Sequence, residues 1–244
     1  MRVLLLIALF GLVACSSKYS EQTAADRNVY TGVNDGQLLY EGELTFESND
    51  AIFAAYNKAS SRFDRLVISS SGGDIGAGME LGTWIKNNNL DVEVASVCAS
   101  SCANYIFTAA NRKYLRKDSV LIWHGSAWQK GWNNEELSET FLTDYLIPMR
   151  KKETQLMASL EVDNILTVYG QTKITLWDKF LMLFGINQAG WDYSLNDMKR
   201  FGLKNIILVD DEWNWRKYRP GKSKLVKRLK IEDAYAFKLR RFEI

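Results

Sequence analysis

The chain has 244 residues, of which 47% are hydrophobic and 25% charged, a balance typical of a folded globular protein and not of a disordered one. The formal net charge of +2 indicates no particular class of partner. The charge is unevenly placed, because residues 213–244 hold eleven Lys and Arg against three Asp and Glu, a local net charge of +8.

The first residues follow the pattern of a secretory signal. Met1 and Arg2 give a positive start, and residues 3–14 are almost wholly apolar. A run of about 12 apolar residues falls short of the roughly 20 that a membrane-spanning helix needs. We therefore expect a signal peptide over residues 1–14 and not a membrane-spanning helix.

The end of this segment, Leu12-Val13-Ala14-Cys15, resembles a bacterial lipobox. The resemblance implies that Cys15 is diacylated and becomes the mature N-terminus, which would attach the protein to a membrane. Ser16 in the next position, where Asp is absent, implies sorting to the outer membrane of a Gram-negative cell, facing the periplasm. The alternative is an ordinary signal peptide followed by a chance cysteine. Residues 15–34 are mostly polar and predict a tether.

Residues 35–212 alternate between strand-like and helical patterns. The short apolar run 66–68 ends in the glycine loop 69–74, which is typical of a buried parallel strand. A helical pattern follows to residue 87, and strand-like runs over 91–97 and 120–123 enclose a further helix. This order predicts an α/β domain over residues 35–212 with a largely parallel sheet.

Three residues that suit chemistry stand at or just past the ends of these predicted strands, where ligands collect in parallel sheets: Gly73, Ser101 and His124. Ser101 lies at a strand-to-helix turn, where free N–H groups stabilise negative charge. His124 is the only histidine and thus the only imidazole base. The alternative interpretation is a turn of small residues and a structural histidine beside Trp123.

Cys98 and Cys102 flank the serine. In helical spacing their Cα atoms would lie about 6 Å apart, within the range that a disulfide accepts, and an oxidising compartment would preserve the bond. Two buried thiols are the alternative. One histidine and two cysteines make a poor ligand set, so we expect no metal site and no cofactor.

Residues 160–190 are rich in large apolar side chains. Too much apolar surface is present for a solvated loop, so the segment predicts a helical cover, a self-association surface or contact with lipid headgroups.

Four segments spread over residues 37–209 resemble the Clp protease proteolytic subunit, within the Clp/crotonase superfamily, and in particular its divergent secreted members. They are Gly42-Glu43-Leu44 with the helix after it, Ser70-Ser71-Gly72-Gly73, Ser101 seven residues before Thr108-Ala109, and the strand 120–124 that ends in His124. The resemblance implies a superhelical ββα-type core with a largely parallel sheet, and this chain adds a helical segment and a basic C-terminal tail to it.

The resemblance also implies roles for single residues. Ser101 would be the nucleophile, His124 the general base, and the amides of Gly73 and Cys102 the oxyanion hole. Asp192 is the best match for the third triad residue, although an ordinary turn acid is an equal interpretation and Asp197 a poorer match. A serine–lysine dyad is a second mechanism, for which neither Lys113 nor Lys117 lies in a suitable motif. Ser71 departs from the proline of the family.

These residues predict a lipid-anchored serine hydrolase of the cell envelope, specifically a peptidase. The family holds an extended peptide or unfolded protein by strand addition beside the glycine loop, which Gly73 occupies here. The alternative is a non-catalytic lipoprotein that binds peptides or proteins on the same fold. A crotonase-type acyl-CoA enzyme is disfavoured, because that cofactor is not expected outside the cytoplasm. The family often forms rings or trimers, which leaves a homo-oligomer open.

The basic segment 213–244 interleaves its charges with aromatic residues. We rank docking of this extension on the domain first and an anionic envelope surface second. Nucleic acid is a distant third and is not expected outside the cytoplasm.

Overall fold

The computed structural model describes residues 30–34, 37–133, 137–174, 189–239 and 242. Its main sheet has the strand order β1-β2-β3-β4-β5-β8, and β6 pairs with the second half of β4. β1 is antiparallel to β2, and the other pairs are parallel, so the predicted α/β class with a largely parallel sheet is confirmed. The strands are β1 (Tyr30–Asn34), β2 (Gln37–Glu41), β3 (Arg65–Ser70), β4 (Asp91–Ala99), β5 (Lys113–Leu115), β6 (Val120–Ile122) and β8 (Ile206–Leu208).

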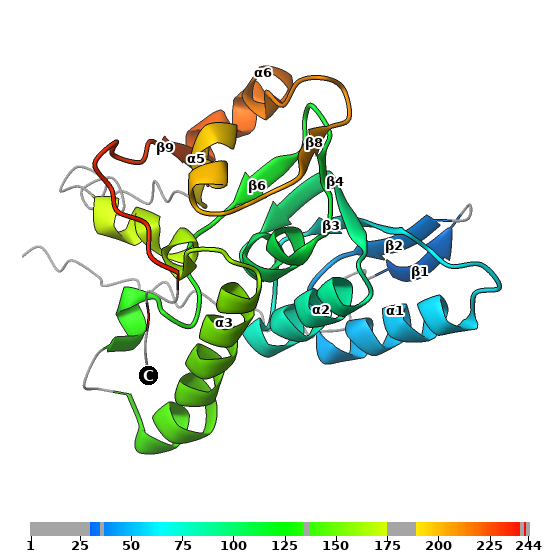
Figure 1. The fold of residues 1–244 in the computed structure, drawn as a ribbon, viewed down its shortest axis with the longest axis horizontal. Helices are drawn as coiled ribbons and strands as arrows, with labels where there is room; N and C mark the ends of the chain where they lie inside the picture. The colour runs from blue at the N-terminus through cyan, green and yellow to red at the C-terminus, as the bar shows by residue number, and fades with distance from the viewer. Residues whose placement is uncertain (1–29, 35–36, 134–136, 175–188, 240–241, 243–244) are drawn as a thin grey trace, which may run out of the picture.

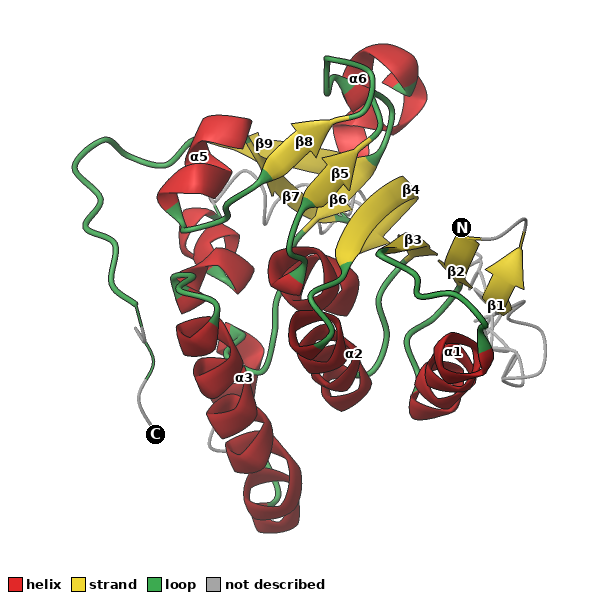
Figure 2. Ribbon diagram, turned by 45° about the vertical axis from the view of Figure 1, so that its right-hand side comes forward, coloured by secondary structure: helices red, strands yellow, loops and turns green. Residues whose placement is uncertain are grey.

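Helices cover one side of this sheet, as Figure 2 shows for α1 (Phe46–Lys58), α2 (Ile75–Asn87) and α3 (Ile147–Ser159). The strand side chains that face them are apolar and fully buried, such as Leu66 and Ile68 of β3. Alternate residues point to the other side, which carries ion pairs such as that of Arg65 with Glu93. The hydrophobic core therefore lies between the sheet and the helices.

Side chains cap the N-termini of α1 and α2, which begin shortly after the carboxyl ends of β2 and β3. The Thr45 hydroxyl accepts from the amide of Ser48 and starts α1 at Phe46. The carboxylate of Asp74 accepts from the Ala77 amide at 2.8 Å and caps α2 directly after Gly73. The glycine loop is therefore held between the end of β3 and the start of a helix.

A second, two-stranded parallel sheet joins β7 (Gly190–Tyr193) to β9 (Val226–Leu229); β9 is labelled in Figure 1 and both strands in Figure 2. A bridge between Trp123 and Trp191 connects this sheet to the main sheet. The remaining helices in the described ranges are the π-helices η2 (Cys102–Phe107) and η4 (Phe141–Leu146), the α-helices α5 (Leu195–Arg200) and α6 (Trp215–Tyr218), and the 3₁₀ helices η3 (Lys130–Asn133), η5 (Asn164–Thr167), η6 (Tyr169–Lys173) and η7 (Pro220–Leu225).

Several predictions fall on parts of the chain that the structure does not describe. The signal peptide 1–14, Cys15 and most of the tether lie in residues 1–29, and much of the apolar stretch 160–190 lies in residues 175–188. Among the described residues, every helix is too short or too polar to cross a membrane.

Candidate active site

The turn between β4 and η2 presents Ser101. β4 ends at Ala99, Ser100 adopts a left-handed backbone conformation with φ of 55°, and Ser101 precedes the first residue of η2. A non-glycine residue in this conformation costs about 1–3 kcal/mol and persists only where its surroundings hold it. Here the Ser100 amide donates to the carbonyl of Ile122 at 2.9 Å and ties the turn to β6.

A disulfide closes the same turn. It joins Cys98 of β4 to Cys102, the first residue of η2, with their Cα atoms 5.1 Å apart. Both cysteines are fully buried. The disulfide therefore spans Ser101 and restrains the amide of Cys102, an N–H of the first helical turn that has no acceptor within the helix.

Glycines let two neighbouring segments approach this turn closely. A Cβ on Gly72 would lie 2.6 Å from Cβ of Ser100, and a Cβ on Gly78 would lie 2.8 Å from Cβ of Ser101. Real Cβ atoms do not come so close, so the serine turn packs directly on the glycine loop and on α2.

Gly73 connects the glycine loop to Ser101. The Ser101 hydroxyl donates to the Gly73 carbonyl at 3.1 Å. Gly73 also forms a parallel bridge with Leu44, which uses the Gly72 carbonyl and the Asp74 amide. In extended backbone the N–H and C=O of one residue point to the same side, opposite to those of its neighbours. The Gly73 amide therefore points to the side of Ser101, and no hydrogen bond among the described residues uses it.

His124 lies at the same edge of the sheet as Ser101. β4 and β6 are parallel, and Ala99 pairs with Ile122. Ser101 follows Ala99 by two residues, and His124 follows Ile122 by two residues. The register therefore carries both side chains to the carboxyl end of the same strand pair.

The imidazole of His124 is accessible. The residue is exposed, although burial of part of the ring lowers its pKa below the ordinary value of 6.5. Its backbone carbonyl accepts from Nε2 of Gln171 at 3.1 Å. Within the described residues the imidazole makes no hydrogen bond, and the Ser101 hydroxyl is bonded to Gly73 instead. Ser101 and His124 are thus assembled at one edge but are not hydrogen-bonded to each other.

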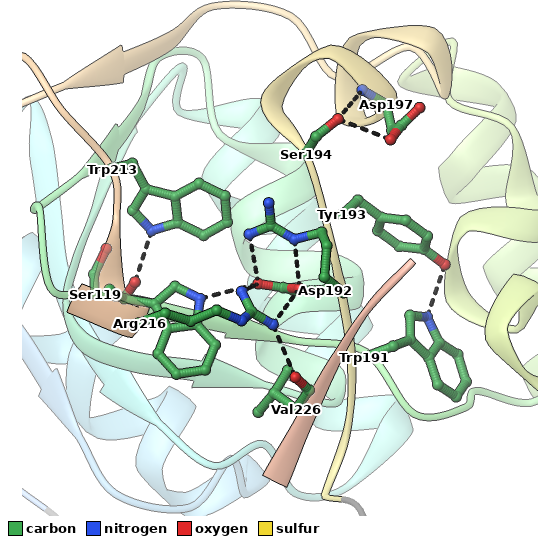
Figure 3. A network of polar contacts seen from close by, with 11 residues as sticks. Ser119, Trp191, Asp192, Tyr193, Ser194, Asp197, Trp213, Arg216 and Val226 are labelled. Atoms are coloured by element: carbon green, nitrogen blue, oxygen red, sulfur yellow. Dashed lines mark hydrogen bonds and ion pairs between the residues drawn. The ribbon is translucent and has the colours of Figure 1, made fainter. Parts of the chain in front are cut away.

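The carboxylate of Asp192 is engaged by the C-terminal extension (Figure 3). It is fully buried and accepts five hydrogen bonds, from the indole of Trp215 and the guanidinium groups of Arg216 and Arg228, at 2.7–3.0 Å. His124 is not among these partners. The neighbouring strand residue Gly190 does lie against the histidine, since a Cβ there would be 3.1 Å from Cβ of His124. Among the described residues, the carboxylate that the resemblance suggests as the third triad member is therefore bonded to the extension and not to the histidine.

Part of the basic segment 213–244 packs on the domain. β9 pairs with β7, Trp215 is 1% exposed, and Ile231 is fully buried. The side chain of Arg200 from α5 donates to the carbonyls of Ile231 and Glu232. These residues of the extension are therefore docked on the domain, which is the alternative that the sequence analysis ranks first.

A cleft opens beside the glycine loop. It has a volume of about 310 Å³ and is lined by Gly42, Glu43, Ser71, Gly72 and Gly73. A larger groove of about 630 Å³ runs between α1, α2 and α3, and Gly76 is its lining residue closest in sequence to the glycine loop. Within the described ranges, no three His, Cys, Asp or Glu side chains gather so that they could hold a metal ion.

Glu153 is a buried acid that the sequence pattern did not single out. It lies on α3, is fully buried, and accepts hydrogen bonds from η2 and from the loop after His124. In the sequence it is one of several charged residues in a row, and nothing in its spacing marks it as internal.

Comparison of the chain with known proteins identified no relative. No protein-family model matches the chain, and no curated protein is significantly similar to it.

Proposed function

We propose that this chain is a lipid-anchored serine hydrolase of the cell envelope, specifically a peptidase, on a Clp/crotonase-like fold. The observation that carries the proposal is the common position of Ser101, Gly73 and His124 at one edge of the sheet, with the serine hydroxyl bonded to the glycine loop. The disulfide across Ser101 supports it further, because it restrains the nucleophile and a neighbouring amide together.

In the proposed reaction, His124 takes the proton of Ser101 as the hydroxyl attacks the carbonyl carbon of a peptide bond. The amides of Gly73 and Cys102 donate to the oxyanion that forms, a contribution worth about 10²–10³ in kcat for each donor. His124 then returns the proton to the leaving amine. Water repeats the cycle on the acyl-enzyme and restores the serine.

The attack requires the Ser101 hydroxyl to exchange its bond with the Gly73 carbonyl for one with His124. The neutral imidazole suits this step, because its lowered pKa keeps it unprotonated at neutral pH. The peptide would enter along the cleft beside Gly73 in extended form. The lipobox-like segment ending in Cys15, with Ser16 after it, supports a location of this reaction at the outer membrane, facing the periplasm.

One observation favours a second candidate, a non-catalytic peptide-binding lipoprotein. The Ser101 hydroxyl is bonded to Gly73 and the Asp192 carboxylate to two arginines, so no triad is hydrogen-bonded within the described residues. The same cleft would then hold a peptide without cleaving it.

A fluorophosphonate probe tests the proposal on the full-length protein in detergent micelles. We expect covalent labelling of the wild type, loss of labelling in Ser101→Ala and His124→Gln, and unchanged labelling in the control Ser61→Ala, which alters an exposed serine after α1. Labelling that survives Ser101→Ala excludes this nucleophile. An unlabelled wild type that binds extended peptides supports the binding protein instead.

A further inference from the structure

Glu153 sits between the two elements that carry the candidate catalytic pair. Its Oε2 accepts from the Tyr105 hydroxyl at 2.9 Å and from the Ala127 amide at 3.1 Å. Tyr105 lies on η2, four residues and about one turn after Ser101, and Ala127 lies three residues after His124. One carboxylate oxygen thus joins the serine helix to the histidine loop.

A second contact joins the same two elements. Nδ2 of Asn104, on η2, donates to the carbonyl of Gly125 at 2.8 Å. Both this bond and those of Glu153 are buried. A direct hydrogen bond and a carboxylate-mediated pair of hydrogen bonds therefore join η2 to the histidine loop, in addition to the pairing of β4 with β6.

The other carboxylate oxygen of Glu153 bonds a third element, η5. Oε1 accepts from the Thr167 hydroxyl at 3.2 Å, and the Thr167 oxygen lies 2.9 Å from that of Ser126. The groups of η2, the histidine loop and η5 that bond this carboxyl group are neutral. Arg150, on the same helix as Glu153, interacts with it electrostatically. Burial raises the pKa of Glu153 to about 7.

Such a site is costly for a residue whose only role is to fill space, because an apolar side chain would avoid the desolvation of a carboxyl group. What an apolar side chain cannot do is accept from Tyr105 and Ala127 together. We propose that Glu153 is a positioning residue, which fixes the separation of Ser101 and His124 by accepting hydrogen bonds from both of their elements. The role rests on the proposed serine hydrolase function.

Substitutions can distinguish the role of the hydrogen bonds of Glu153 from the role of its charge. Glu153→Leu removes both acceptors, and Tyr105→Phe removes only the bond to the serine helix. Glu153→Gln keeps an oxygen for Tyr105 and Ala127 and turns its amide group to the Thr167 hydroxyl, which can accept. Asp91→Asn is the matched control, because Asp91 is also a buried acid but bonds Asn111 and Arg112 at the start of β4.

The measurement is the kinetics of fluorophosphonate labelling on the full-length protein in detergent, resolved into the probe's affinity and its maximal rate of inactivation. We expect Glu153→Leu and Tyr105→Phe to lower the maximal rate about tenfold or more, since small displacements of reacting groups are costly, with affinity unchanged. Glu153→Gln should stay near the wild type, and Asp91→Asn should lower only the melting temperature.

A purely structural acid gives a different result. Glu153→Leu and Tyr105→Phe would then lower the melting temperature while the folded protein kept its maximal rate, and the inference would be overturned. Should Glu153→Leu fail to fold, Tyr105→Phe alone decides by the same criterion. A wild type that is not labelled at Ser101 overturns the proposed function and the role of Glu153 with it, whereas a labelled wild type with unaffected variants overturns only the latter.

Discussion

Ser101 donates its hydroxyl hydrogen bond to the carbonyl oxygen of Gly73, 3.1 Å away and 28 residues earlier in the chain. The bond holds the serine turn on the glycine loop and leaves the Gly73 amide directed to the same side. In the proposed reaction, the Ser101 hydroxyl leaves the Gly73 carbonyl, and the carbonyl oxygen of the substrate accepts from the Gly73 amide. The conformation of Gly73 is therefore the first feature to test.

Gly73→Ala should disable the site. Its φ is 155°, and a Cβ would lie 2.3 Å from the Leu44 carbonyl oxygen, so the bridge to Leu44 must open and turn the amide away from Ser101. We expect probe labelling to slow by about 10²-fold, the loss typical of one oxyanion donor. Gly131→Ala is the control, because no atom would lie within 4 Å of its Cβ. Equal labelling of both variants would contradict the role of Gly73.

The pH dependence of labelling should reflect His124. Burial of part of the ring lowers the pKa of this imidazole below 6.5, so the neutral base persists to lower pH than for a free histidine. Labelling should therefore be constant from about pH 8 to pH 7 and fall only below about pH 6.5. Rates measured between pH 5 and pH 8 check this. A midpoint above 6.5 would show a different base or a different environment.

Removal of the disulfide should weaken both stability and reactivity. The loop that Cys98 and Cys102 close is short, so the loss of chain restraint corresponds to about 2 kcal/mol of unfolding free energy. Urea unfolding of the double variant Cys98→Ala, Cys102→Ala measures it, and labelling should slow because Ser101 and the Cys102 amide lose their restraint. Reductant should destabilise the wild type and leave the double variant unchanged. Identical unfolding midpoints would refute the stabilising role.

Asp192→Asn distinguishes a structural carboxylate from a triad member. Arg216 and Arg228 would lose their shared anion, and we expect a loss of about 3 kcal/mol, near the low end for a broken buried pair because both guanidinium groups reach solvent. Labelling per folded molecule should remain within about threefold of the wild type. Asp233→Asn, which alters an exposed acid of the same extension, is the control. A fall in labelling of about 10⁴-fold without loss of stability would instead identify Asp192 as the third triad residue.

Cys15→Ser tests the membrane anchor. Without the thiol the chain cannot be diacylated, so it should leave the membrane fraction or stay as an unprocessed precursor, since stable attachment needs more than one acyl chain. Incorporation of labelled fatty acid and fractionation of the cell envelope measure this. A Cys98→Ala variant should still incorporate the label. Unaltered fractionation of Cys15→Ser, with no label in the wild type, would refute the lipoprotein interpretation.

The sequence alone was sufficient for the α/β class and for the common location of three candidate residues. Short apolar runs such as 66–68, separated by helical patterns, specify parallel strands, because a strand buried on both faces leaves little room for polar residues. Since parallel strands end at one edge, Gly73, Ser101 and His124 were expected together there. Local patterns carry this information because each strand or helix must bury its own apolar residues.

Only the tertiary structure decided which partner each buried polar group has. Asp192 follows Trp191, which bridges to Trp123 beside the histidine, yet its carboxylate bonds Arg216 and Arg228, because the β7–β9 pairing brings the extension to it. Glu153 follows Arg150, Lys151 and Lys152 and resembles part of a solvated helix face. The packing of α3 turns this one acid inward, against Tyr105 and Ala127. Such pairings join residues far apart in the chain, so no local pattern encodes them.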